Sequence, residues 1–333
     1  MILKELPSDF KVTEITDIKL GEGKYSVFSL KKTNYTTEDA VRRICDAAGL
    51  KRKQISYAGI KDKVAVTRQF ITIERVNSNR IENLNFKNIS LKHLGYINRP
   101  LSLGLLKANS FEIIVRKLSR PVLASQDYLI NYFDEQRFSE NNHIIGKSII
   151  LQDFKSAANA LSQDSKYGQK ITEYLAINAN DYVGAIKLIP TRIIQIYMHS
   201  YQSYLWNMLV FNILNSFDDL PSDLKLPLPG FDTPPTSQRY KKVLDAILNL
   251  EQVKSRDFIL RQFPKVSLEG TLRKVFVEAE GLKAHFFDDE LYENYYAVKL
   301  DFILKPGSYA TCVIKQLLGF EKEFRGCELI NIE

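Results

Sequence analysis

A carboxylate between two lysines is the most chemically suggestive feature of this 333-residue sequence. Asp62 follows Lys61 and precedes Lys63, in a polar stretch that begins after Gly59. Nearby positive charge keeps a carboxylate ionised. Because lysines also bind phosphate, such an anion could attack an electrophilic carbon of a bound nucleotide. A solvated charged turn would have the same residue pattern, so the residues alone leave both interpretations open.

Other catalytic and cofactor-binding signatures do not occur in the sequence. Gly146-Lys147-Ser148 resembles the end of a phosphate-binding loop, but Asn141 occupies the position of the required first glycine. There is no GxGxxG, HExxH or GxSxG motif. The three cysteines and four histidines are scattered and include no CxxC pair. We therefore expect no metal and no cofactor.

The charge of the chain is unevenly distributed. Residues 1–130 contain 23 Lys and Arg against 13 Asp and Glu, whereas residues 131–333 contain 23 against 26. A basic N-terminal part in a chain with a pI near 9.0 indicates a polyanionic partner, most often RNA or DNA. A surface that is rich in lysine throughout would give the same excess.

Several motifs resemble those of one enzyme family. The stretch from Tyr57 to Gln69, YAGIKDKVAVTRQ, closely resembles the signature of the TruD family of pseudouridine synthases, in which a GxKD element carries the catalytic aspartate. Other stretches are similar to further family elements, in the same order along the chain: Pro7–Val12, Gly21–Gly23, Leu103–Phe111, Asn131–Phe138, His199–Asn207 and Leu304–Thr311.

Four residues depart from the family pattern. Ala108, Asp134 and Ser139 stand where the family has glycine, and Lys305 stands where proline is usual. Asp134 would either add an anion near the RNA or change the local turn.

The resemblance implies a catalytic residue and a pocket for an extruded base. Asp62 is the implied catalytic carboxylate, acting at C6 of the uracil or at C1′ of the ribose. The target base must leave its stack. Phe10 and Tyr309 match aromatic positions of the family, and the amide of Asn109 can bind the uracil edge. Phe111, two residues farther along the same strand, would support the pocket from the same side.

Three lysines are the expected contacts to the RNA backbone. Lys4 matches a family lysine that would reach phosphate or approach Asp62. Lys61 and Lys63 would contact phosphates beside the target nucleotide. Such contacts contribute affinity and salt sensitivity rather than sequence choice.

Hydrophobic periodicity predicts the elements that must position these residues. Phe10–Ile18 and Tyr25–Leu30 alternate on either side of Gly21–Gly23, which predicts a β-hairpin. Thr36 and Thr37 precede apolar residues at helical spacing, and Gly49 ends that helix. Further strands are predicted at 68–73, 111–115, 272–277 and 295–304. Helices are predicted near 121–133, 153–163 and 191–216, and a short one is expected to begin near 307.

The resemblance also implies the fold and the domains. The expected class is α+β, a pseudouridine-synthase core with a mixed, largely antiparallel sheet flanked by helices. This core would comprise residues 1–127 and 272–333. A mostly helical α/β insertion domain would occupy residues 128–271.

The function implied by the resemblance is isomerisation of uridine to pseudouridine in tRNA, at the D-arm uridine of position 13. The reaction consumes nothing, so the resemblance also implies neither cofactor nor metal. Two alternatives stay open: the same chemistry on other RNAs, and a non-catalytic protein that binds or folds tRNA. No run of 18 apolar residues and no signal-peptide-like start occurs. We therefore expect a cytoplasmic monomer whose partner is tRNA and which binds no membrane.

Overall fold

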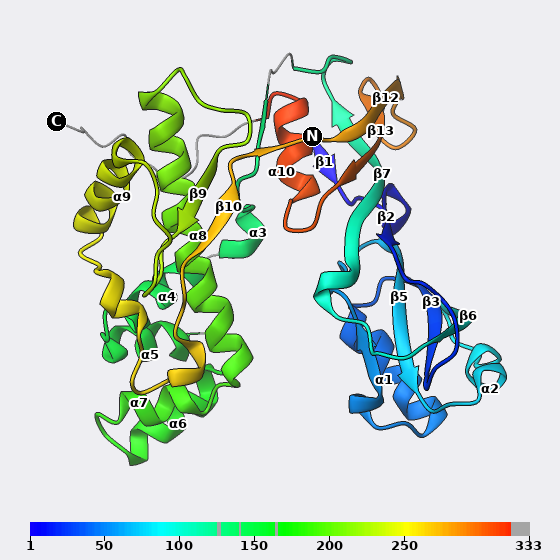
Figure 1. The fold of residues 1–333 in the computed structure, drawn as a ribbon, viewed down its shortest axis with the longest axis horizontal. Helices are drawn as coiled ribbons and strands as arrows, with labels where there is room; N and C mark the ends of the chain where they lie inside the picture. Colours follow the sequence, from blue (N-terminus) through cyan, green and yellow to red (C-terminus); the bar gives the residue numbers. More distant parts are fainter. Residues whose placement is uncertain (125–127, 140, 164–165, 321–333) are drawn as a thin grey trace. The chain divides into compact units, whose positions relative to one another are not determined.

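The chain forms two compact units in the computed structural model, and each unit combines segments that are far apart in sequence. Unit 1 comprises Met1–Ser125 and Glu278–Ala310, and unit 2 comprises Gln126–Val277 and Thr311–Glu333. The structure describes residues 1–124, 128–139, 141–163 and 166–320 (Figure 1).

The units differ from the predicted domains near the C-terminus. We predicted that residues 272–333 return to the sheet domain, but the chain returns only at Glu278 and leaves again after Ala310. Hydrogen bonds explain the second difference, because the Gln316 side chain bonds the backbone of Ile130 within unit 2.

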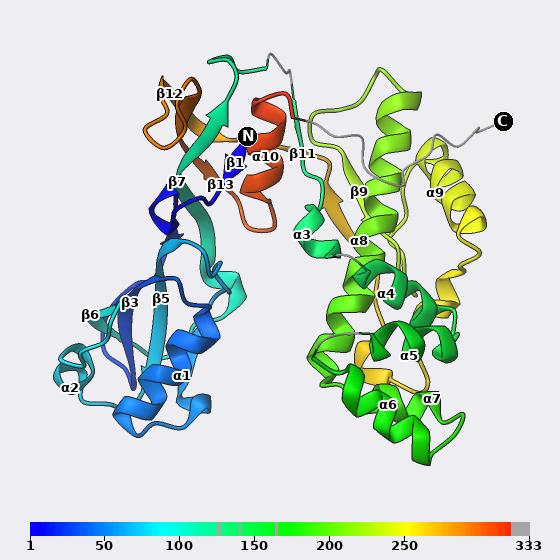
Figure 2. The same cartoon turned by 180° about the vertical axis from the view of Figure 1, so that it is seen from behind.

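Unit 1 is built on a nine-stranded sheet within the described residues (Figure 2). The order along its main path is β12-β13-β7-β2-β5-β3-β6, while β1 pairs with β7 and β4 pairs with β5. The β2–β5 pair is parallel and the other strand pairs are antiparallel. The predicted mixed, largely antiparallel sheet is thus confirmed. Its strands are β1 (Ile2–Leu3), β2 (Phe10–Thr16), β3 (Tyr25–Thr33), β4 (Ile55–Tyr57), β5 (Val66–Glu74), β6 (Ile89–Ile97), β7 (Leu106–Leu118), β12 (Glu280–Asp288) and β13 (Tyr296–Leu304).

The predicted hairpin between β2 and β3 is wrong. Strand β5 lies between them, parallel to β2 and antiparallel to β3. The glycine-containing turn instead contacts β6, where Gly21 forms a bridge with Tyr96. Alternating hydrophobicity specifies which side chains face the core, but it does not specify which strand lies alongside.

The helix predicted after Thr36 forms as α1 (Thr37–Ala48), and it packs on one face of this sheet. The Thr36 hydroxyl accepts a hydrogen bond from the Asp39 amide at the helix start, and Gly49 ends the helix with a φ of 65°. Its apolar face packs with strand residues in one core: Ala40, Val41, Ile44, Cys45 and Ala48 of the helix with Phe28, Leu30, Ile55, Ile71, Ile73, Ile89 and Leu91 of the strands. The other helical segments of unit 1 are α2 (Ser78–Glu82), η1 (Pro7–Asp9), η2 (Arg52–Gln54) and η3 (Leu103–Leu105).

Unit 2 is mostly helical and is organised around the long helix α8 (Thr191–Ser216), which confirms the predicted helix at 191–216. The helix predicted at 153–163 is α5 (Phe154–Ser162). The remaining helical segments are α3 (Glu135–Phe138), α4 (Asn142–Ile150), α6 (Gly168–Ile177), α7 (Tyr182–Lys187), α9 (Gln238–Leu250), η4 (Ser255–Phe258), η5 (Pro264–Val266) and α10 (Ala310–Leu317), the last of which begins at the final residue of unit 1. Two short strand pairs join β9 (Lys225–Leu228) to β10 (Thr271–Lys274), and β8 (Leu129–Ile130) to β11 (Phe276–Val277).

The helix predicted near 121–133 does not form in the described part of that stretch, and residues 125–127 lie outside the description. Leu129 and Ile130 form strand β8 instead. The amide of Asn131 continues this pairing by donating to the carbonyl of Val275. Pairing with a segment nearly 150 residues away therefore overrides the local helical pattern.

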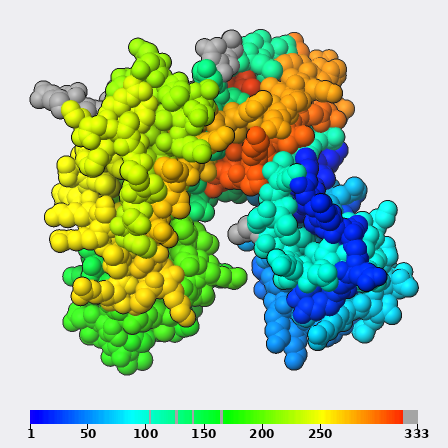
Figure 3. Space-filling model, viewed as in Figure 1, coloured from blue at the N-terminus to red at the C-terminus, as the bar shows by residue number. Residues whose placement is uncertain are grey.

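Both halves of the sequence supply the surface of unit 1. Figure 3 shows segments near the N-terminus in blue and segments near residue 290 in orange, and both belong to this unit.

None of the helices within the described ranges has the length and apolar character that a membrane-spanning helix needs.

Candidate active site

Asp62 lies in the loop between β4 and β5, and its carboxylate faces solvent. The side chain is 40% exposed, and its Oδ2 accepts a hydrogen bond of 3.0 Å from the Nζ of Lys4. The structure therefore brings Lys4 to the carboxylate, which is one of the two expectations for this lysine. Lys4 adopts a φ of 60°, and its ammonium lies 4.4 Å from the centroid of the Phe10 ring.

A buried ion network fixes the segment that carries Lys4 and Phe10. Asp9 binds the guanidinium of Arg116 through both carboxylate oxygens, at 2.8 and 2.9 Å, and its Oδ2 accepts from the amide of Leu6. Arg116 also binds Asp289 at 3.1 Å. Hydrogen bonds to Asp9 and Asp289 raise the pKa of Arg116. Since the network is buried, it ties the N-terminal segment firmly to strand β7.

Lys61 does not occupy the position that we predicted. Its ammonium is buried and forms a 2.6 Å ion pair with Oε1 of Glu14, a residue of β2 whose side chain is fully buried. The second oxygen of Glu14 accepts from the Phe70 amide at 2.9 Å. The expectation of a phosphate contact is therefore wrong for Lys61, because its charge is neutralised beneath the loop. Lys63, by contrast, is exposed.

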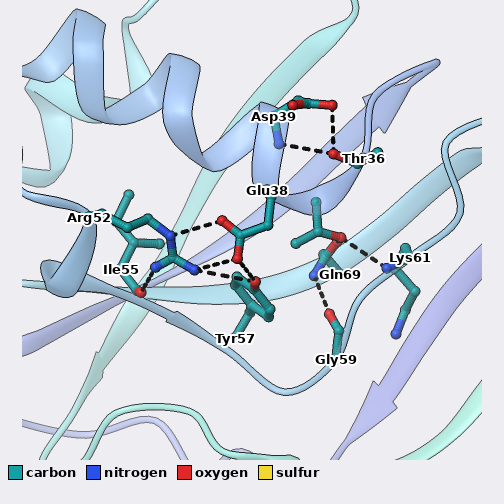
Figure 4. Close-up of polar contacts among 10 residues, drawn as sticks. Thr36, Glu38, Asp39, Arg52, Ile55, Tyr57, Gly59, Lys61 and Gln69 are labelled. Carbon is teal, nitrogen blue, oxygen red and sulfur yellow. Dashed lines mark hydrogen bonds and ion pairs between the residues drawn. The ribbon is translucent and has the colours of Figure 1, made fainter. Parts of the chain in front are cut away.

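Side chains anchor the part of the loop that precedes Asp62 (Figure 4). The amide of Lys61 donates to the Thr37 hydroxyl at 2.9 Å, and that hydroxyl donates to Oε1 of Gln69 at 2.8 Å. The amide nitrogen of Gln69 in turn donates to the carbonyl of Gly59 at 3.1 Å. Helix α1 and strand β5 thus hold the loop in place. An ordinary solvated turn lacks such anchors, which argues against the second interpretation of the Lys-Asp-Lys pattern.

The strand that enters the loop is also attached to helix α1 (Figure 4). Glu38 accepts hydrogen bonds from Arg52 at 3.0 and 2.9 Å and from the hydroxyl of Tyr57. Arg52 also donates to the carbonyl of Ile55 at 2.7 Å. These contacts connect Ile55 and Tyr57 of β4 to helix α1.

Phe10 and Phe111 pack against each other inside unit 1. Their rings are 6.3 Å apart in an edge-to-face arrangement, and Phe111 stacks on Phe302 at 5.4 Å. Both phenylalanines are buried. Phe111 therefore supports the site from within the core, and the face of Phe10 is in contact with Lys4 rather than open to solvent.

Asn109 lies on β7 directly opposite Glu14 of β2 and Leu304 of β13. Its Oδ1 is buried and has no hydrogen-bond partner among the described residues. A buried carbonyl oxygen without a partner is costly, and a ligand that supplies a donor would remove the cost. Tyr309 lies half-buried in the segment between Leu304 and α10.

Sequence reasoning missed Glu14 and Lys32, and it used Thr37 only as a helix-capping residue. Glu14 follows Phe10 and Val12 at alternating positions of β2, and Lys32 follows Phe28 and Leu30 in the same way on β3. A charged residue at an inward-facing strand position is rare unless it is paired. This pattern was the available signal that both residues have a structural or catalytic task.

The family-like motifs of unit 2 meet inside that unit. These motifs are Asn131–Phe138 and His199–Asn207. The side chain of Asn207 bonds both the amide and the carbonyl of Phe133 at 3.0 Å. The amide nitrogen of Gln202 is bonded to the carbonyls of Pro229 and Glu269. These contacts give the motif residues a structural role within unit 2.

The structure shows the consequences of two of the departures from the family pattern. Asp134 is buried, receives hydrogen bonds from Thr311 and Lys315, and has a φ of −76° that suits any residue. It is therefore not a free anion. Ser139 adopts φ 45° and ψ −139°, a region that normally requires glycine. The serine at this position is accordingly strained.

No group of three or more His, Cys, Asp or Glu residues that could hold a metal ion occurs in the described segments. Cys45 and Cys312 are free and buried, and Cys327 lies outside the described residues.

Comparison with known proteins identifies the family. The family model of tRNA pseudouridine synthase D (TruD) matches residues 1–170, 152–224 and 215–317, which together cover nearly the whole chain. The chain belongs to the TruD family. The GxKD element described above comprises residues 59–62 and lies within the matched region.

Individual TruD proteins cover almost the full length of this chain. The tRNA pseudouridine synthase D of Aquifex aeolicus is 28% identical, and the alignment covers 95% of this chain and 97% of that protein. A relative from Methanosarcina acetivorans is also 28% identical, with coverage of 95% and 92%. The crystal structure of a TruD protein from Methanosarcina mazei matches with a TM-score of 0.75 and 25% identity, over 95% of this chain and 93% of that one.

Proposed function

We propose that this TruD protein isomerises uridine to pseudouridine at position 13 of tRNA, with Asp62 as its catalytic carboxylate and without a cofactor. The observation that carries the proposal is the arrangement at Asp62. Its loop is anchored from below by buried side chains, yet its carboxylate is exposed and bonded to Lys4. Membership of a family of tRNA pseudouridine synthases supports the same assignment.

The chemistry needs one positioned carboxylate and a site for an extruded base. The C1′–N1 bond breaks, the uracil turns, and C5 bonds to C1′ while the hydrogen of C5 leaves as a proton and N1 gains one. Asp62 acts on the uridine at C6 of the base or at C1′ of the sugar. Lys4 donates a hydrogen bond to the carboxylate, and Oδ1 of Asn109, which has no partner among the described residues, is available to bind the uracil edge. Tyr309 provides an aromatic surface for the base.

Two matched tRNA transcripts test the substrate. One contains uridine at position 13 and the other contains cytidine there, with all other nucleotides identical. We expect pseudouridine at position 13 of the first transcript and none in the second, as mapped by carbodiimide modification and primer extension. Pseudouridine at other positions would overturn the position-13 assignment while leaving the chemistry intact. No pseudouridine in these transcripts or in total cellular RNA would overturn the enzyme assignment.

Lys63 is the lysine beside Asp62 that remains available for phosphate, since its side chain is exposed. We expect Lys63→Gln to reduce the slope of log K for tRNA binding against log salt by about 0.7–0.9, the value for one lost phosphate contact. The matched control is Lys92→Gln. Lys92 is exposed and follows Leu91, whose side chain lies in the core shared with helix α1. The side chain of Lys92 therefore lies on the face of the sheet opposite to α1. Equal slopes for the two variants would contradict the phosphate contact.

The cytoplasmic location and the monomeric state remain predictions. Gel filtration coupled to light scattering would measure the second directly.

A further inference from the structure

Lys32 is a completely buried lysine that the proposed chemistry does not use. It lies on β3 at the position after Phe28 and Leu30 that faces helix α1, and none of its surface is exposed. Burying an ammonium is costly unless polar groups replace its water. A lysine in this position therefore requires compensating contacts.

The contacts of Lys32 are main-chain carbonyls, and one of them belongs to Asp62 itself. Its Nζ donates to the carbonyl of Asp62 at 2.8 Å and to the carbonyl of Tyr35 at 2.7 Å. Burial and the nearby Lys61 lower the pKa of Lys32 to about 8, and the charge of Asp62 partly opposes them. The Lys32 ammonium thus contacts the backbone of Asp62, whereas Lys4 binds its carboxylate.

We infer that Lys32 is a positioning residue for pseudouridine formation, which holds the backbone of Asp62 and so directs its carboxylate toward the substrate. This inference rests on the proposed function. Among the described residues, three side chains bond the backbone of the loop: Gln69 the Gly59 carbonyl, Thr37 the Lys61 amide and Lys32 the Asp62 carbonyl. Of these three, only Lys32 bonds the backbone of the catalytic residue itself.

The geometry explains why a lysine serves this purpose. Asp62 is separated from the nearest residue of β5, Val66, by three loop residues, so the strand ladder does not fix its backbone. A long, flexible stem with an ammonium at its end can reach from β3 to the loop and bind two carbonyls at once. Because a misplacement of about 1 Å at a catalytic group can reduce a rate roughly 100-fold, loss of this anchor affects chemistry more than binding.

The test compares Lys32→Met with Lys31→Met. Methionine retains most of the stem but has no donor, and Lys31 is the adjacent, exposed lysine of the same strand. We expect the single-turnover rate of Lys32→Met on tRNA to fall about 100-fold, with its Kd for tRNA within threefold of wild type. Hydrogen exchange in the peptide that contains residues 58–65 should become faster. Lys31→Met should match wild type in rate and exchange.

One further variant and the wild-type reference keep the outcomes distinct. Lys32→Gln, which is uncharged but retains a shorter donor, replaces Lys32→Met if the latter does not fold. A folded, uncharged Lys32 variant with a rate within threefold of Lys31→Met would overturn the inference, as would a loss of rate that is fully explained by weaker tRNA binding. If wild type itself forms no pseudouridine, the proposed function fails instead.

Discussion

Asp62→Asn is expected to abolish pseudouridine formation while the protein remains folded and continues to bind tRNA. The amide has nearly the same shape and still accepts a hydrogen bond from Lys4, whose Nζ contacts Oδ2 in the wild-type structure. It is, however, neither a nucleophile nor a base. We expect the single-turnover rate to fall by about 10³-fold or more, as when the nucleophile of an enzyme is removed.

The rate is best measured by tritium release from tRNA that contains [5-³H]uridine, because the hydrogen of C5 leaves when C5 bonds to the sugar. The matched control is Asp46→Asn, which changes an exposed aspartate on α1. We expect its rate and tRNA affinity to equal those of wild type. Turnover of Asp62→Asn within tenfold of wild type would overturn the catalytic assignment. A fall in rate that is matched by a fall in tRNA affinity would indicate a binding role instead.

Lys61→Met is expected to destabilise unit 1 strongly. The substitution leaves the carboxylate of Glu14 buried without its ion-pair partner, which lies 2.6 Å away in the wild type. Removing one partner of a buried ion pair typically costs about 3–5 kcal/mol. We therefore expect a clear decrease in the urea midpoint of unit 1. Far-UV circular dichroism is the suitable measurement, because the one tryptophan of the chain, Trp206, lies in unit 2.

Two variants separate burial from the loss of a surface charge. Lys63→Met makes the same change at an exposed position and should alter the free energy of unfolding by less than about 0.5 kcal/mol. The double variant Glu14→Gln/Lys61→Met removes both charges and should recover part of the lost stability. If Lys61→Met were as stable as wild type and also reduced the salt dependence of tRNA binding, our original expectation of a phosphate contact would be restored.

Local sequence patterns predicted the helices that are specified by residues close together in the sequence. The cap at Thr36 and the glycine at 49 mark the ends of α1, and the long apolar face of 191–216 corresponds to α8. Predictions failed where distant segments compete. Leu129 and Ile130 pair with Phe276 and Val277 rather than continuing a helix. The tertiary pairing supplies hydrogen bonds and burial that no local preference can match.

The order of strands in the sheet could not be predicted either, because it also depends on pairing between segments that are far apart in the sequence. The spacing of Phe10, Val12 and Glu14 identifies the inward face of β2, but it is compatible with any neighbouring strand. A short turn favoured β3 as the partner. The structure instead inserts β5, and this arrangement places the Phe70 amide within reach of Glu14.

The sequence by itself determined the family and the α+β class, since the GxKD motif and its companions lie in order along nearly the whole chain, and it supplied Asp62 as the candidate carboxylate. Only the tertiary structure decided what each lysine near Asp62 does. Lys4 binds the carboxylate, Lys32 holds its backbone, Lys61 pairs with Glu14, and Lys63 remains exposed. In sequence these are four similar cations. Their roles differ because the cost of burying a charge depends on partners that are 30–58 residues away along the chain.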